Sequence, residues 1–246
     1  MKPEIKYQHF RIKKRKGSYR YIYSPQEDLK EYQNNLLKQF YKVEPHEVNH
    51  GFIPNRSIVT NAEPHLNKNW VLSLDISNFF PSTTSDKVKL IFEKWYPHLI
   101  QEVPYVLYKN HIPQGAPTSP YLANFALYDF DTHLSKYCYK NNITYTRYAD
   151  DLTFSYDSTC LKTLLKYVNA TIKDYGYFIN RRKTKLMPKH KRQIVTGVIV
   201  NQKLSIPREI KNLTRTLKHV SKNQKLQNYS EDWLSGMNGY EQMIPN

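Results

Sequence analysis

Two adjacent aspartates inside an otherwise apolar segment restrict the fold more than any other feature of this chain. Residues 143–156 read ITYTRYADDLTFSY, with apolar and aromatic residues on both sides of Asp150 and Asp151. Charged groups in such surroundings need partners. Successive side chains of a strand point to opposite faces, so both carboxylates reach one ion only if the backbone turns sharply. The segment therefore predicts two short strands joined by a tight bend at 149–151.

A third acid ends another apolar segment. Asp75 closes VLSLDI at 71–76, which predicts a buried strand. Three carboxylates at strand ends suit Mg²⁺, a hard ion that takes oxygen ligands and shares its coordination shell with substrate phosphates. Two such ions stabilise the attacking and leaving oxygens of a phosphoryl transfer. The alternative is a turn at Asp150–Asp151 and a cap at Asp75. The two segments together favour a site for two Mg²⁺ ions on Asp75, Asp150 and Asp151.

The charge of the chain indicates a polyanionic partner. It has 37 Lys and Arg against 21 Asp and Glu, a net charge of +16. Nucleic acid, an anionic membrane face and heparin-like sugars all fit this surplus. No run of 18 apolar residues and no secretory signal is found, and 21 tyrosines offer faces for base stacking. Nucleic acid is therefore favoured over a membrane. Cys138 and Cys160 form no CxxC pair, which favours buried thiols in a cytoplasmic protein.

The periodicity of the remaining chain predicts an α+β fold. Residues 1–25 are basic and rich in tyrosine. The run of Lys and Arg at 13–16 is either a solvated arm or a phosphate contact. Residues 43–69 are expected as irregular loops, and 111–120 as a turn-rich loop. A strand is expected at 193–200. Helices are expected over 26–42, from Thr84 or Ser85 to a stop before Pro97, over about 17 residues from Pro120, over 159–175, after Pro207 and over 230–244.

Four segments together resemble the reverse transcriptase family. They are LSLDISNFF at 72–80, IPQGAPTSP at 112–120, YADD at 148–151 and GYFINRRKTKLM at 176–187. They follow the order and spacing of the family, and the resemblance covers about residues 10–245. It implies a right-hand polymerase architecture with Mg²⁺-dependent, RNA-directed DNA synthesis from deoxynucleotides. The implied division is fingers at 1–70 and 98–115, palm at 71–97 and 116–200, and a short helical thumb at 201–246.

The resemblance also implies roles around the incoming nucleotide. Phe80 would lie under the sugar and clash with a ribose 2′-OH. Gln114 and Gly115 would form the floor beside the nucleotide. Three basic residues would contact the phosphates: Lys183, Arg56 and Arg20. The alternatives are a core phenylalanine, an ordinary turn and a solvated surface, respectively.

Two further segments resemble the retron branch of the family. NAEPH at 61–65 and VTG at 195–197 match its patterns. This implies a structured non-coding RNA as partner, priming from the 2′-OH of an internal guanosine, a branched RNA-linked DNA product, and a role in anti-phage defence with an effector or toxin protein. The residues expected to help recognise the RNA are Asn61, Ala62, His65, Val195, Thr196 and Gly197. A loop with a capping histidine and a buried strand are the alternatives.

Two competing functions stay open at this point. The chain could be an RNA-binding scaffold that restrains a toxin partner, which the charge of +16 fits equally well. Three clustered acids argue against that, because a scaffold gains nothing from them. The chain could also be another bacterial reverse transcriptase, of the group II intron, diversity-generating or untemplated defence type. Sequencing of the product distinguishes these.

Overall fold

A four-stranded antiparallel sheet forms the centre of the computed structural model. The model describes residues 2–13, 17, 19–158, 161–222, 236, 239 and 242–244. The strands lie in the order β4 (Thr144–Tyr148), β5 (Asp151–Tyr156), β3 (Trp70–Asp75) and β6 (Lys185–Pro188). Helices and strands mix as expected, so the α+β prediction is confirmed.

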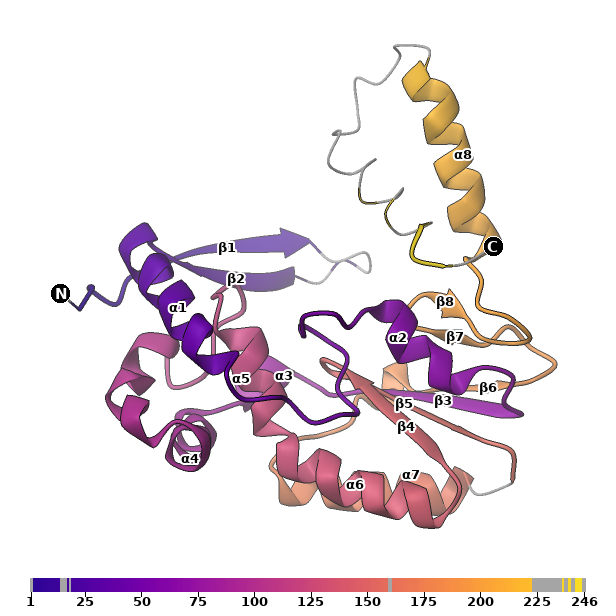
Figure 1. Ribbon diagram of the computed structural model, residues 1–246, viewed down its shortest axis with the longest axis horizontal. Helices are drawn as coiled ribbons and strands as arrows, with labels where there is room; N and C mark the ends of the chain where they lie inside the picture. Colours follow the sequence, from indigo (N-terminus) through magenta and orange to yellow (C-terminus); the bar gives the residue numbers. More distant parts are fainter. Residues whose placement is uncertain are drawn as a thin grey trace.

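Helices cover the central sheet unevenly (Figure 1). Figure 1 shows α6 (Tyr128–Lys140) and α7 (Leu161–Asp174) side by side along one face, while α2 (Ile58–Ala62) lies towards the other. The helices α1 (Glu27–Phe40), α3 (Phe79–Ser82), α4 (Ser85–Trp95) and α5 (Ser119–Ala126) gather at one end of the sheet. None of the helices within the described ranges is both long and apolar enough to cross a bilayer.

The apolar run of β3 serves two cores, because alternate residues of a strand face opposite sides. Leu72 and Leu74 enter the main core together with Phe154 of β5. Val71 enters a smaller core with Ala62 and the segment after the sheet. Both faces of β3 are therefore buried, and this explains why the segment reads as continuously apolar rather than alternating.

The remaining elements lie around this centre. Figure 1 shows two short hairpins that flank the sheet, and it shows α8 standing apart from the sheet beyond β7 and β8. Their bounds are β1 (Tyr7–Lys13), β2 (Tyr19–Pro25), β7 (Ile194–Val195), β8 (Val198–Ile199) and α8 (Arg208–Lys222), with short 3₁₀ segments at Glu63–His65, Pro97–Val106 and Arg181–Lys183.

Three predictions about local structure are wrong in detail. The 17-residue helix after Pro120 is two helices, because the backbone leaves the helical conformation at Leu127 (φ −108°, ψ 8°). The strand expected at 193–200 is a tight hairpin, since Thr196 and Gly197 both have positive φ (46° and 92°). The loops expected at 43–69 include α2, whose N-cap Ser57 forms a capping box with Thr60. The helix expected at 230–244 falls mainly outside the described residues.

A buried ion pair connects α6 to the central hairpin. The guanidinium of Arg147 on β4 lies 2.5 Å from Asp131 on α6, and both side chains are fully buried. Tyr145 donates a hydrogen bond of 2.7 Å to the same carboxylate. Arg147 also donates to the backbone carbonyls of Ala149 (3.1 Å) and Asn124 (3.1 Å). One side chain thus binds α5, α6 and the bend that carries the paired aspartates.

Removing the charge of Asp131 should destabilise the fold strongly, because Arg147 would be left as an uncompensated buried charge. We expect Asp131→Asn to lower the free energy of unfolding by about 3 kcal/mol or more. Asp129→Asn is the matched control, two residues away on α6, and it breaks an exposed pair with Lys94. It should cost less than about 1 kcal/mol. Urea unfolding of both variants measures this, and equal losses would contradict it.

Candidate functional site

The sheet brings the three predicted carboxylate residues to one edge. Asp75 ends β3 and is the cross-strand partner of Asp151 at the start of β5. Side chains that oppose each other in this way have Cβ atoms about 4.5–5.5 Å apart. Asp150 occupies the bend, and its carbonyl accepts a hydrogen bond of 2.9 Å from the backbone N–H of Ile76. The bend is therefore bonded directly to the end of the strand that carries Asp75.

The bend itself is a sharp backbone turn with close support. Ala149 has a φ of 56°, in the left-handed region. A Cβ on Gly51 would lie 2.6 Å from the Ala149 nitrogen, so only glycine allows the loop to approach this closely. Asn124 donates a hydrogen bond of 2.8 Å to the Gly51 carbonyl. The sequence prediction of two strands with a tight bend is confirmed.

The carboxylates disfavour one another's charge. Burial, followed by the charges of Asp150 and Asp75, raises the pKa of Asp151 from 3.8 to about 6. Burial, followed by the charge of Asp75, also raises the pKa of Asp150. Folding has therefore placed Asp150 and Asp151 where burial and neighbouring carboxylates disfavour their charged forms. This is the electrostatic arrangement that a bound cation relieves.

Lys183 is the cation nearest to this cluster. Its ammonium nitrogen lies 2.6 Å from an oxygen of Asp75. Burial opposes protonation, but the hydrogen bond and charge of Asp75 outweigh it and raise the pKa of Lys183. Within the described part of the chain, no three acidic, His or Cys side chains form an assembled metal-binding group. Instead, the carboxylate of Asp75 (the residue is 5% exposed) is bound to a lysine that is itself largely exposed.

A cavity of about 830 Å³ opens beside the carboxylates. Most of the residues predicted for the site line it, although they come from distant parts of the chain. These are Asp75, Asp150, Phe80, Gln114, Gly115, Lys183 and Arg20. Asp151 and Arg56 are not among the lining residues. The cavity also has lining residues that the sequence prediction missed: Ile22, Phe52, Ser77, Asn78, Asn180 and Arg182.

Two of the missed residues could have been found. Asn180 and Arg182 stand in the same segment as Lys183, between the last helix of the core and β6. The backbone N–H of Asn180 donates a hydrogen bond of 2.7 Å to the carbonyl of Asp75. No local pattern marks Phe52 as a site residue. It reaches the cavity because its loop folds over the bend at Ala149.

The glycine after Gln114 is explained by close packing. Gln114 accepts a hydrogen bond of 2.7 Å from the N–H of Tyr23 in β2. Gly115 has a φ of 116°, and a Cβ there would lie 2.7 Å from a methyl carbon of Ile22. The loop thus joins the N-terminal hairpin to the cavity, and a side chain at Gly115 would push the two apart.

The two adjacent phenylalanines after Asp75 have different surroundings. Phe79 is buried and packs on Tyr177, with ring centroids 5.7 Å apart. Phe80 is partly buried and lines the cavity. Both lie in the short helix α3, which begins after the left-handed Asn78 (φ 47°), and consecutive residues of a helix point in different directions. Phe80 thus both contacts the main core and lines the cavity, and its role under the sugar stays a prediction.

Arg56 lies away from the cavity. Its guanidinium donates to the backbone carbonyls of His46 (3.2 Å), Glu47 (2.8 Å) and Asn49 (2.5 Å). In this structure it therefore organises the loop that carries Gly51. A contact of Arg56 with nucleotide phosphates stays a prediction, and the structure does not bring it to the other site residues.

The two segments that resemble the retron branch meet in space. Asn61 donates a hydrogen bond of 3.3 Å to the hydroxyl of Thr196, which donates one of 2.9 Å to the carbonyl of Ile58. The hairpin of β7 and β8 is thereby bound to α2. Thr196 is half-buried and Gly197 is exposed.

The other members of this group are buried: Asn61, Ala62, His65 and Val195. His65 lies between the hydroxyls of Ser155 (2.7 Å) and Thr146 (2.8 Å). Burial lowers its pKa to about 3, so it is neutral. Of this group, only Thr196 and Gly197 are accessible to a partner, and Asn61 holds their turn through its hydrogen bond to Thr196. A role of the group in RNA recognition stays a prediction.

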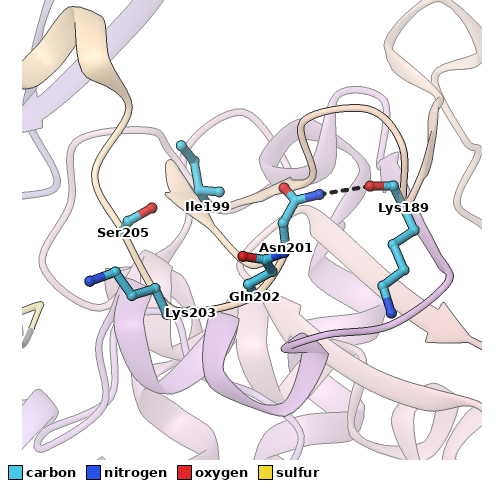
Figure 2. Close-up of a pocket in the computed structure, with 6 residues that line it drawn as sticks. All are labelled: Lys189, Ile199, Asn201, Gln202, Lys203 and Ser205. Atoms are coloured by element: carbon cyan, nitrogen blue, oxygen red, sulfur yellow. Dashed lines mark hydrogen bonds between the residues drawn. The ribbon is translucent and has the colours of Figure 1, made fainter.

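A second cavity of about 270 Å³ lies beside β8 (Figure 2). The side-chain amide of Asn201 donates a hydrogen bond of 3.1 Å to the carbonyl of Lys189, as Figure 2 shows. This bond joins two loops, and each loop contributes a lysine to the lining, Lys189 and Lys203. The cavity is separate from the carboxylates and is basic in character.

The arrangement of sheet, bend and helices defines a right-hand polymerase fold. The structure is similar to that of apo telomerase from Candida tropicalis, with a TM-score of 0.61 and 11% identity over 84% of this chain and 50% of that one. It is also similar to telomerase from Candida albicans in complex with a TWJ fragment of telomeric RNA, with a TM-score of 0.59 and 10% identity over 95% and 54%.

Sequence comparison identifies the family. Residues 12–200 match the model of the family described as reverse transcriptase (RNA-dependent DNA polymerase). Retron Ec86 reverse transcriptase of Escherichia coli is 35% identical over 88% of this chain and 70% of its own length. Retron Mx65 reverse transcriptase of Myxococcus xanthus is 33% identical over 97% of this chain, which spans 61% of that relative. The chain belongs to the reverse transcriptase family.

Neutralising Asp151 should stabilise the metal-free protein, because its folded-state pKa of about 6 lies above the ordinary 3.8. At pH 7.5 the ionised carboxylate therefore opposes folding. We expect Asp151→Asn to raise the free energy of unfolding in EDTA by about 1–2 kcal/mol. The gain should shrink as the pH falls from 7.5 to 5, because the Asp151 carboxylate of the folded wild type is then largely protonated and uncharged.

Urea unfolding at both pH values measures the effect of Asp151→Asn. Asp86→Asn, an exposed acid in the first turn of α4, is the control and should give no gain. A loss of stability in Asp151→Asn at pH 7.5 would contradict the prediction, because it would show that the ionised Asp151 carboxylate does not oppose folding.

Proposed function

We propose that this chain is an RNA-directed DNA polymerase of the retron type. The main support is the position of three mutually repelling carboxylates, Asp75, Asp150 and Asp151, at the edge of a polymerase sheet beside a large cavity. The substrates are deoxynucleotides and an RNA template. Family membership and retron relatives at 30–35% identity support this activity.

Asp75, Asp150 and Asp151 fit the role of Mg²⁺ ligands. They supply only carboxylate oxygens, which Mg²⁺ prefers. Burial and the neighbouring carboxylates raise the pKa values of Asp150 and Asp151, and a bound cation would favour their charged forms. When bound, two such ions would lower the barrier to attack by the primer hydroxyl and neutralise charge on the triphosphate.

The other cavity residues bind and orient the nucleotide. Lys183, Arg182 and Arg20 line the cavity with positive charge, which supports a role in binding the triphosphate. Phe80 lines the cavity, which supports a position under the sugar, where its ring would clash with a ribose 2′-OH. The loop at Gln114–Gly115 is held against β2 by its hydrogen bond to Tyr23, so it forms a stiff floor. Positioning and charge stabilisation of this kind perform most of the work in phosphoryl transfer.

The partner in this proposal is a structured non-coding RNA. The net charge of +16 supplies affinity for a phosphate backbone, and the turn at Thr196–Gly197 offers an exposed contact. The enzyme primes from an internal guanosine 2′-OH and makes a branched RNA-linked DNA. It acts in anti-phage defence with an effector protein. In the same scheme the fingers comprise 1–70 and 98–115, the palm 71–97 and 116–200, and the thumb 201–246.

Asp150→Asn should abolish DNA synthesis and leave RNA binding intact, because it removes one metal ligand and keeps the size of the side chain. Primer extension on an RNA template with deoxynucleotides and Mg²⁺ measures synthesis, and a gel mobility shift measures RNA binding. Asp86→Asn, an exposed acid on α4, is the control and should extend as the wild type does. Extension by Asp150→Asn would contradict the assignment of the site.

The retron assignment predicts a specific nucleic acid on the protein purified from its native locus. We expect a short DNA that survives RNase and changes gel mobility after treatment with debranching enzyme. DNA of random sequence would indicate an untemplated polymerase, and an unbranched templated copy would indicate another reverse transcriptase branch. RNA with no DNA would favour the second candidate, a scaffold that restrains a toxin, which the charge of the chain also fits.

A further inference from the structure

The N-terminal hairpin of β1 and β2 has two chemically different faces. Its register pairs Ile12 with Arg20 and Phe10 with Ile22. Cross-strand partners share one face of a sheet. Arg20 and Ile22 line the catalytic cavity, so this face is the inner one. The alternate residues form the opposite face, which we call the outer face: His9, Arg11, Lys13, Tyr19 and Tyr21.

The outer face is covered by the protein only at its base. There, Tyr7 and Tyr23 both pack on Tyr108, with ring centroids 4.9 and 4.7 Å apart. Further along the hairpin, Tyr21 is 57% exposed and Tyr19 is 41% exposed. Figure 1 shows the hairpin extending beyond the helices at this end. Two partly exposed tyrosine rings therefore stand on a protruding hairpin.

Positive charge accompanies these rings. The guanidinium of Arg11 lies 4.5 Å from the centroid of the Tyr19 ring. Lys13 is the cross-strand partner of Tyr19, and Arg11 is that of Tyr21. Across the described ranges, no carboxylate forms an ion pair with Arg11 or Lys13. The outer face thus combines aromatic surface with cations that the fold leaves without counter-charges.

We propose that the outer face is a stacking platform for single-stranded RNA. Unpaired bases stack on exposed aromatic rings and on the guanidinium plane of arginine, while cations bind the phosphates. Tyr19 and Tyr21 stand two positions apart in a strand, about 6.8 Å, which matches two base steps of about 3.4 Å. Paired bases cannot use these rings, because their faces are already stacked within the duplex.

Charge and position favour RNA over a protein partner. The face is cationic in a chain of net charge +16, and its opposite side lines the cavity that would hold the templating base. This inference rests on the proposed function, which makes RNA the substrate. The strand that it binds is either the unpaired template ahead of the cavity or an unpaired segment elsewhere in the same RNA.

The test uses the full chain with Tyr19 and Tyr21 both replaced. Fluorescence anisotropy with a labelled oligouridine of about 20 nucleotides measures binding to single strands, and a blunt RNA duplex serves as the paired probe. We expect Tyr19→Ala with Tyr21→Ala to weaken oligouridine binding about tenfold or more and duplex binding less than about twofold. Equal loss on both probes would overturn the proposal, because stacking acts on unpaired bases only.

Two further variants guard against a folding defect. Tyr19→Phe with Tyr21→Phe keeps the rings and should bind oligouridine within about twofold of the wild type. Tyr139→Ala removes a tyrosine that is 86% exposed on α6, away from the hairpin, and should change nothing. Wild-type oligouridine affinity in the double alanine variant would overturn the proposal, as would an equal loss in the double phenylalanine variant.

Primer–template duplexes separate the two sources of the strand. If the double alanine variant loses affinity only for duplexes that carry a 5′ template overhang, the outer face binds the unpaired template. If the variant binds overhang and blunt duplexes with equal affinity but binds oligouridine more weakly than the wild type does, the outer face binds another unpaired segment of the RNA. Failure of the wild type to extend a primer would overturn the proposed function, and the binding comparison would still decide the outer face.

Discussion

The contact between Arg147 and Asp131 is the interaction on which the site depends. It is fully buried, and it connects helix α6 to the strand that leads into the bend at Ala149–Asp150. A buried charge pair rarely adds much stability in itself, because desolvation offsets the attraction. Its value here is geometric. Arg147 donates to the carbonyl of Ala149 in the bend and to that of Asn124 in α5, so it connects the backbone that leads to Asp150 and Asp151 to both α5 and α6.

That rigid support allows the protein to hold acids together that repel one another. The raised pKa values of Asp150 and Asp151 show that the folded state opposes their ionisation. Lys183 partly offsets the repulsion through Asp75. Lys183 is largely exposed, and we propose that it exchanges this carboxylate for a nucleotide phosphate when substrate binds.

The extent to which the sequence predicted the structure differs between local and distant features. The bend at 149–151, the strand that ends in Asp75 and the helix that begins at Ser85 follow from local patterns, and the structure confirms them. The single helix after Pro120 and the strand at 193–200 were wrong, because one apolar pattern fits a continuous or a broken element equally well. Backbone turns at Leu127 and at Thr196–Gly197 decide between them.

By itself, the sequence determined the family, the α+β class and the candidate metal- and nucleotide-binding residues, since these depend on residue types at short, fixed spacings. Only the tertiary structure decided which of them meet. Thr196 binds Asn61 although 135 positions separate them. Arg56 binds carbonyls of its own loop, and the hairpin presents Arg20 to the cavity and Tyr21 to solvent. Packing and strand register set these contacts, and neither can be read from residues that are neighbours in sequence.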